Sequence, residues 1–295
     1  MPTELGDGGS IMGGNLNWLY CTGNPMKYPS RPWLSHALKG VASLSLTFLV
    51  LEFFDEMDYA IGGAALPAMF DELALSYAQV GLLLGLPTLI NTFVEPILML
   101  LGDTSLRKRI ILGGGLMLGV ASLLISGAIS FLLLLIGFVF GRIASGAFVS
   151  LSQASLMDLN AGREPHMMAR WGVAGTLGNL IGPLILAGAF ALGAGWRPVY
   201  AGLAVCYLVL TVIVWIQPFP VRAAPVESRD EGILARGRQL MRNFWETARS
   251  PGLIRWILLM QFADLMLDIF ISYMPLYFVE IVGLSNSQVS LLLSA

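Results

Sequence analysis

The stretch Leu75-Ser-Tyr-Ala-Gln-Val-Gly-Leu-Leu-Leu-Gly85 occurs a second time in the chain, as Leu284-Ser-Asn-Ser-Gln-Val-Ser-Leu-Leu-Leu-Ser294. The two copies are identical at seven of eleven positions and lie 209 residues apart. The same offset aligns a second set of residues, in which Leu49, Phe53, Asp55 and Met57 match Leu258, Phe262, Asp264 and Met266. Two windows that share one offset indicate a repeated structural unit, and one of them carries an acidic residue in an apolar context.

The composition around these copies is that of a membrane protein. Hydrophobic residues make up 56% of the 295 residues, charged residues make up 12%, and the mean hydropathy is +0.74. Soluble domains carry about 25% charged residues, so a water-soluble globular domain is excluded. Apolar runs of the length of a spanning helix fall at 41–66, 78–101, 110–128, 131–156, 169–192, 197–217 and 253–278, and an eighth begins near Ser287. The sequence therefore predicts an all-α polytopic membrane protein.

Lysine and arginine are distributed unevenly along these runs. If the N-terminus is cytoplasmic, 15 of the 17 Lys and Arg residues fall in cytoplasmic segments. The positive-inside rule therefore predicts a multi-pass protein of the plasma (inner) membrane with a cytoplasmic N-terminus. The chain has no basic face for nucleic acid, and its two cysteines provide neither a disulfide framework nor a zinc site.

The repeat also predicts the organisation of the chain. We expect a flexible cytoplasmic tail over 1–40, a six-helix transmembrane bundle over 41–217, a charged cytoplasmic linker over 218–252, and the start of a second bundle over 253–295. Under the offset, Ala295 corresponds to Leu86, which lies in the second helix of the first unit. The chain is thus expected to be C-terminally truncated: one complete six-helix bundle plus the first one to two helices of the second.

Four motifs at matching places resemble those of the major facilitator superfamily. Between the second and third runs, Asp103 and Arg107-Lys108-Arg109 match the family's loop, although Met99, Thr104 and Leu106 replace two glycines and an arginine. Arg142-x3-Gly146 resembles a motif of the fourth span. The fifth span contains Gly178-x3-Gly182-Pro183, similar to the motif of the family's antiporters, but with Leu186-Ala187 in place of the trailing glycines. The first span ends in Met57-Asp-Tyr-Ala-Ile-Gly-Gly-Ala-Ala-Leu-Pro67, which is similar to a signature of multidrug exporters.

This resemblance implies two helical bundles that rock around a central cavity and so give alternating access to it. It also favours the proton-coupled efflux, or antiporter, branch of the family. It also implies that the loop is a gate. We expect this gate loop to contain Asp103, Arg107, Lys108 and Arg109, with Glu95 at the end of the second span belonging to it.

The first span carries four acids, Glu52, Asp55, Glu56 and Asp58, within an arc of about 160° at 100° per residue. Four neighbouring carboxylates cannot all be ionised cheaply in the membrane, so at least one is expected to hold a proton near neutral pH, as a proton carrier must. Arg142 lies deep in the fourth span, where a lone guanidinium is costly. We therefore expect it to pair with Asp55 or Glu52.

The seventh span presents Gln261, Asp264 and Asp268 at helical spacing. Because Asp264 is the repeat partner of Asp55, both acids are expected to face the central cavity from opposite halves. Together with the acids of the first span and Arg142, these residues are the candidates for proton and substrate translocation. Cationic or polar substrates would find ligands among them.

The predicted function is proton-coupled export of a small organic solute by alternating access, with protons, the solute and membrane lipids as partners of a monomer. Two alternatives keep the same fold: uptake by proton symport, and a transport-inactive sensor. A membrane enzyme is not expected, because the chain lacks Gly-x-Ser-x-Gly, His-Glu-x-x-His and a second aspartate motif of intramembrane proteases. No cofactor or metal is expected.

Overall fold

The computed structural model describes residues 32–217, 219, 242 and 251–294. The chain divides into two compact units, 1–38 and 39–295, and the description below concerns the second. The regular elements of the described residues are all helices, which confirms the predicted all-α class. They are α1 (Pro32–Glu72), α2 (Tyr77–Gly102), α3 (Arg107–Ser126), α4 (Phe131–Ser145), η1 (Gly146–Ser150), α5 (Leu151–Leu159), α6 (Glu164–Ala191), α7 (Arg197–Ile216), α9 (Pro251–Glu280) and α10 (Asn286–Leu293).

Several of these helices match the dimensions of a membrane. Five are long and apolar enough to cross one: Tyr77–Gly102, Arg107–Ser126, Phe131–Leu159, Glu164–Ala191 and Arg197–Ile216. The third of them runs from α4 through the π-helical turn η1 into α5. Helix α1 is 41 residues long and carries the four acids near its middle. The chain is a multi-pass membrane protein, as its composition predicts.

The repeated sequence forms the same local structure twice. Ser76 is the N-cap of α2 and Ser285 is the N-cap of α10, and each forms a reciprocal capping box with the glutamine three residues later. The residue two positions before each cap has a positive φ, 47° at Ala74 and 78° at Gly283. Glycine adopts this conformation without the steric cost that alanine incurs. The two copies thus turn the chain between successive helices in the same way.

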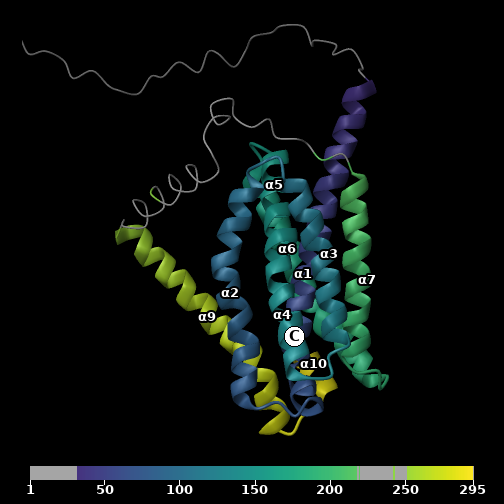
Figure 1. The fold of residues 1–295 in the computed structure, drawn as a ribbon, viewed down its shortest axis with the longest axis vertical. Coiled ribbons are helices and arrows are strands. Elements are labelled where there is room, and N and C mark those ends of the chain that lie inside the picture. Colours follow the sequence, from purple (N-terminus) through teal and green to yellow (C-terminus); the bar gives the residue numbers. More distant parts are fainter. Residues whose placement is uncertain (1–31, 218, 220–241, 243–250, 295) are drawn as a thin grey trace, which may run out of the picture. The chain divides into compact units, whose positions relative to one another are not determined.

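The helices from α1 to α7 lie lengthwise beside one another (Figure 1). Helix α3 packs against α4 and α7, α2 packs against α4, and α10 packs against α6. Close approach depends on small residues of α3: a Cβ at Gly115 would lie 2.2 Å from Thr211 Oγ1, and one at Gly119 would lie 2.9 Å from Leu208 Cδ2. Such residues let membrane helices pack through dispersion contacts, since burial from lipid supplies no hydrophobic gain.

A polar cluster joins three helices at one end of the bundle. Glu72, the last residue of α1, accepts hydrogen bonds from Trp196 Nε1 at 2.7 Å and from Arg197 Nε at 2.8 Å. Arg197 also donates to the carbonyl of Ser126 at the end of α3, and the Ser126 hydroxyl donates back to the Arg197 carbonyl, each at 2.8 Å. The cluster fixes this end of α1 while the acids lie further along the helix.

Candidate functional site

The four acids of α1, Glu52, Asp55, Glu56 and Asp58, are called the acid segment below. They contact three different neighbours of α1: Glu52 and Glu56 face α6, Asp55 faces α4, and Asp58 faces α7. The polar side chains that meet them are Trp171, Asn179, Ser145 and Tyr207. Each of these hydrogen-bonding side chains is neutral, and the positive charge that acts on the acids comes from Arg142, which interacts electrostatically with Asp55.

Helix α6 meets the acid segment through polar side chains. Glu52 is 7% exposed and interacts with the side chain of the buried Trp171. Two turns further along α6, the amide of Asn179 donates to Glu56 Oε2 at 2.8 Å. A buried carboxyl is stabilised only when such donors reach it. Helix α6 therefore sets the positions of two of the four acids.

The glycines of α6 bring its backbone against that of α1. A Cβ at Gly178 would lie 2.2 Å from the Phe53 carbonyl oxygen, and one at Gly182 would lie 2.7 Å from the Met57 carbonyl oxygen. Gly182 and the adjacent Pro183 are buried. Gly178, Gly182 and Pro183 form the motif that resembles the antiporter signature, and in the structure its glycines contact the α1 main chain at Phe53 and Met57, between the acids. An added methyl group at Gly178 would meet main chain, which cannot rotate away.

Asp58 and a main-chain carbonyl oxygen of α1 both contact the hydroxyl of one tyrosine. Tyr207 Oη of α7, which is fully buried, lies 3.0 Å from the Phe54 carbonyl oxygen and 3.2 Å from Asp58 Oδ2. A tyrosine has one O–H and can also accept. If Asp58 is ionised, two acceptors compete for one proton; if it is protonated, it donates to Tyr207 while Tyr207 donates to Phe54. Protonated Asp58 therefore satisfies every group in the cluster.

The expected ion pair of Arg142 is not formed. The ion pairs among the described residues join Arg107 to Asp103 and Asp158, and Arg197 to Glu72. Arg142 is exposed, and Asp55 interacts with it electrostatically while facing the side chain of Ser145. The predicted pair required Arg142 to be buried between helices. Arg142 therefore acts on Asp55 through a longer-range electrostatic interaction and not through a direct ion pair.

The three polar candidates of the seventh span lie on one helix. Gln261, Asp264 and Asp268 belong to α9, in agreement with the predicted helix. Their side chains lie outside the part of the chain that the structure describes. That Asp264 faces Asp55 across a central cavity stays a prediction.

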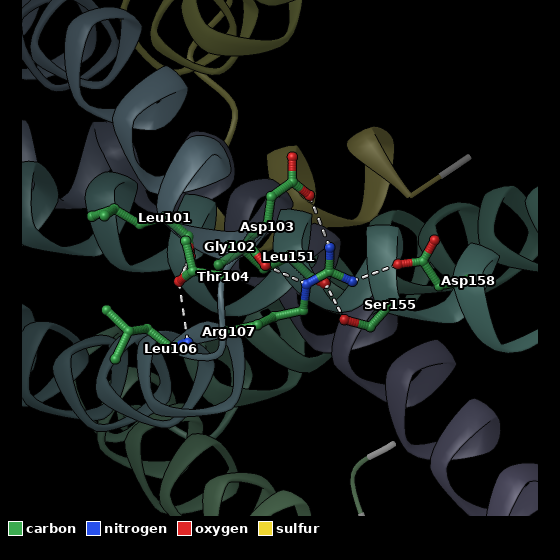
Figure 2. Close-up of polar contacts among 9 residues, drawn as sticks. All are labelled: Leu101, Gly102, Asp103, Thr104, Leu106, Arg107, Leu151, Ser155 and Asp158. Carbon is green, nitrogen blue, oxygen red and sulfur yellow. Dashed lines mark hydrogen bonds and ion pairs between the residues drawn. The ribbon is translucent and has the colours of Figure 1, made fainter. Parts of the chain in front are cut away.

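The gate loop connects α2 to α3 and is organised by Arg107 (Figure 2). Its guanidinium donates to the Gly102 carbonyl oxygen at 2.6 Å, to Asp158 Oδ2 at 2.6 Å and to Asp103 Oδ1 at 3.2 Å. The Arg107 side chain is 12% exposed, while those of Asp103 and Asp158 are 48% and 37% exposed. The multiple donors of one guanidinium thus tie the loop to the end of α5. The loop borders a cavity of about 490 Å³.

The other two basic residues of the loop differ from Arg107. Lys108 Nζ donates to the carbonyl oxygens of Trp215 and Gln217, both at 3.0 Å, and so caps the end of α7. Arg109 is exposed. The motif's consecutive basic residues therefore perform separate tasks at the end of the bundle opposite the Glu72 cluster.

Glu95 does not contact the charged residues of the gate loop, with which its place in the sequence grouped it. Its Oε2 accepts from Asn91 Nδ2 at 2.8 Å, and its Oε1 accepts from Ser150 Oγ at 2.9 Å. Asp55 interacts with it electrostatically. The side chain therefore points toward η1 and the acid segment. The π-turn is the reason, because it places Ser150 on the side of the helix that faces α2.

Sequence reasoning missed three groups of the candidate site: Trp171 and Tyr207, which contact acids of α1, and Asp158, which pairs with Arg107. The first two carry a polar atom inside an apolar run, and buried tyrosine and tryptophan need a partner for it. Asp158 stands near the end of the fourth span, on the side where the gate loop also lies. Within the described residues, no cluster of three or more His, Cys, Asp or Glu side chains could hold a metal ion.

Comparisons with known proteins agree with this architecture. The family model described as "Major Facilitator Superfamily" matches residues 48–295. Two solved structures of a bacterial homologue of the human lysosomal transporter Spinster are similar, both inward-facing, one unoccupied and one occupied. Their TM-scores are 0.65 and 0.64 at 20% and 19% sequence identity. Comparison with curated protein sequences found no match.

The two structural matches cover 89% of this chain. The chain spans only 59% and 57% of the lengths of those two proteins. At this level of identity the likeness concerns the fold. The residues matched by the family model include both the acid segment and the gate loop, since both lie within 48–295.

Proposed function

We propose a transport function from one premise: this chain belongs to the major facilitator superfamily. The whole protein is then a secondary active transporter that moves a small organic solute across a membrane by alternating access. The family match over residues 48–295 and the multi-pass helical fold support this function. No enzymatic step is part of it.

Proton coupling at the acid segment is the specific part of the proposal. The observation that carries it is the shared hydroxyl of Tyr207, whose contacts with Phe54 and Asp58 are both satisfied only when Asp58 bears a proton. The neighbouring acids have neutral partners, and carboxylates in such surroundings exchange protons in response to small changes in geometry. Movement of α1 against α6 and α7 would then be linked to proton uptake and release.

The substrate would bind where the exposed charges lie. Arg142 is exposed on α4, and Glu56 and Asn179 meet at the surface between α1 and α6. Asp264, Asp268 and Gln261 of α9 would complete this surface from the second half, as the repeat predicts. Because carboxyl groups outnumber basic groups on this surface, a polar or cationic solute is the expected substrate.

Export in exchange for protons is the direction that we favour, because Gly178, Gly182 and Pro183 resemble the antiporter motif and its glycines contact the α1 main chain between the acids. The orientation would place the N-terminus and the gate loop at the cytoplasmic face of the plasma membrane. In that orientation the Arg107 network closes the inner end of the bundle.

The test is solute flux in proteoliposomes that contain the full-length protein and a panel of labelled organic cations and neutral polar solutes. We expect flux driven by a pH gradient, loss of that drive when the gradient is collapsed, and loss of coupling in Asp55→Asn. Inverted and right-side-out vesicles separate export from symport uptake. Flux that ignores both the gradient and Asp55→Asn would refute proton coupling, and absence of flux for every solute would favour a sensor.

A further inference from the structure

Glu95 bridges two helices by using both oxygens of its carboxyl group. Asn91 Nδ2, one turn earlier on α2, donates to Oε2 at 2.8 Å, and Ser150 Oγ at the end of η1 donates to Oε1 at 2.9 Å. Glu95 is half-buried. Its contact with Ser150 is a side-chain hydrogen bond between α2 and η1, so Glu95 holds α2 against the π-turn.

The π-turn lies directly beside the candidate site. It begins at Gly146, immediately after Ser145, which faces Asp55, and one turn after Arg142. Turns of this kind are rare and concentrate at functional sites, because they can revert to the α-helical pattern and rotate the residues on either side. A change at Ser150 can therefore be transmitted to Ser145 and Arg142.

Asn91 has an unused acceptor that points into this contact. The side chain is 7% exposed, and among the described residues nothing donates to its Oδ1. A Cβ at Gly146 would lie 3.4 Å from Asn91 Oδ1 and 3.6 Å from Glu95 Cδ. The missing side chain of Gly146 thus leaves room for the two polar groups. A buried acceptor without a donor is unfavourable, and a proton on Glu95 would provide one.

The charged groups near Glu95 come from α1 and α4. Asp55 of α1 interacts electrostatically with Glu95, and Arg142 of α4 interacts with Asp55. A proton on either acid therefore lowers the negative charge that the other one faces. Glu95 is consequently coupled to the acid segment without touching it.

We propose that Glu95 is a second proton-binding site, and that its protonation weakens the contact between α2 and the π-turn of the fourth span. In the ionised state Glu95 accepts from Asn91 and Ser150. When one proton binds to Oε2, the Asn91 amide rotates, its Oδ1 accepts the new O–H, and Ser150 loses its charged acceptor. The physiological meaning of this step rests on the proposed proton coupling. The step itself requires no transport, so it can be tested alone.

The experiment measures the separation of α2 from the fourth span as the pH changes. Spin labels replace the exposed Phe93 of α2 and Phe140 of α4, in this chain with Cys21 and Cys206 changed to serine and reconstituted in nanodiscs. We expect the distance distribution to shift as the pH falls. Glu95→Gln should show the acid distribution at every pH, because glutamine can donate to Asn91 Oδ1 and still accept from Ser150.

A second variant keeps the test decisive if Glu95→Gln perturbs folding. Ser150→Ala removes a donor that stabilises the ionised form of Glu95 more than the neutral form, so the transition should move to higher pH with similar end states. Thr92→Val is the matched control, since the exposed Thr92 donates to the Thr88 carbonyl of its own helix, and it should behave as the parent chain.

Three outcomes would overturn the proposal: no shift in the parent chain, a shift that Glu95→Gln leaves unchanged, or an unmoved transition in Ser150→Ala. Asp55→Asn separates this proposal from the function proposed above. If the shift survives in Asp55→Asn, Glu95 binds its proton independently, even where the full-length protein fails to couple flux to protons. If Asp55→Asn abolishes the shift and Glu95→Gln does not, the proton site lies in the acid segment alone.

Discussion

The gate loop and the acid segment differ in the partners of their charged side chains. At the gate loop, Arg107 is paired with two carboxylates and a carbonyl oxygen, at distances from 2.6 to 3.2 Å. In the acid segment, four carboxyl groups meet neutral side chains, and no ion pair reaches them within the described residues. Both regions are rich in charge, yet only the first resembles a structural salt-bridge network.

The difference follows from where the two regions lie. At the end of the helices, water can solvate the half-exposed Asp103 and Asp158, so permanent charges cost little and their pairing holds the loop in place. In the middle of α1, a permanent charge is expensive, and neutral donors stabilise either protonation state. The gate loop is therefore suited to holding a conformation, and the acid segment is suited to exchanging protons.

The largest effect is expected for Gly178→Ala, which forces a methyl group to within 2.2 Å of the Phe53 carbonyl oxygen. Helices α1 and α6 must separate, which should cost about 1–3 kcal/mol of stability and misplace the acids. Gly172→Ala and Gly188→Ala are matched controls on the same helix, because a Cβ added at either position would have nothing within 4 Å. Thermal unfolding in detergent measures all three. Equal stability of Gly178→Ala and the controls would show that α6 does not set the acid segment.

An intermediate effect on stability is expected when one aspartate in each of the two regions is replaced by asparagine. Asp158→Asn breaks an ion pair with Arg107 and should cost about 1–2 kcal/mol, as for a partly buried charge-assisted hydrogen bond. Asp58→Asn should cost little, because the amide can donate to Tyr207 as a protonated carboxyl group would. Thermal unfolding of the two variants at neutral pH makes the comparison. A large loss in Asp58→Asn with none in Asp158→Asn would reverse the roles of the two regions.

A smaller effect than that of Asp158→Asn is expected for Tyr207→Phe, which removes one hydroxyl and little packing volume. The Phe54 carbonyl and Asp58 lose their shared partner, so about 1 kcal/mol of stability should be lost. In the Asp58→Asn background the loss should be similar, since the asparagine keeps the role of the protonated acid. A double-mutant cycle measures this, and a strong coupling between the two changes would argue that Asp58 is ionised.

The sequence was sufficient for the parts that depend on local patterns. Apolar runs located the helices, and the repeat related the segment that begins α2 to the segment that begins α10. The sequence did not predict the features that depend on how the helices pack against one another. The exposure of Arg142 depends on what surrounds α4, and a depth estimate carries no information about that.

The hydrogen-bond partner of Glu95 on the fourth span could not be predicted for a different reason. Its partner Ser150 ends a π-turn, and such a turn changes the angular register that the α-helical pattern assumes. Tyr207 and Asp158 lie far along the chain from Asp58 and Arg107, so only the tertiary arrangement reveals their pairing. The partners of charged groups were thus the least accessible part of the site.

The infrared carboxyl band of this chain in nanodiscs at neutral pH tests most directly whether the acid segment stores protons. We predict a band from protonated carboxyl groups that weakens in Asp58→Asn and is unchanged in Asp103→Asn and Asp158→Asn, whose acids pair with the Arg107 guanidinium. Absence of a protonated band in the parent chain would contradict proton storage in the acid segment. So would a band that survives Asp58→Asn undiminished and disappears when the gate-loop acids are replaced.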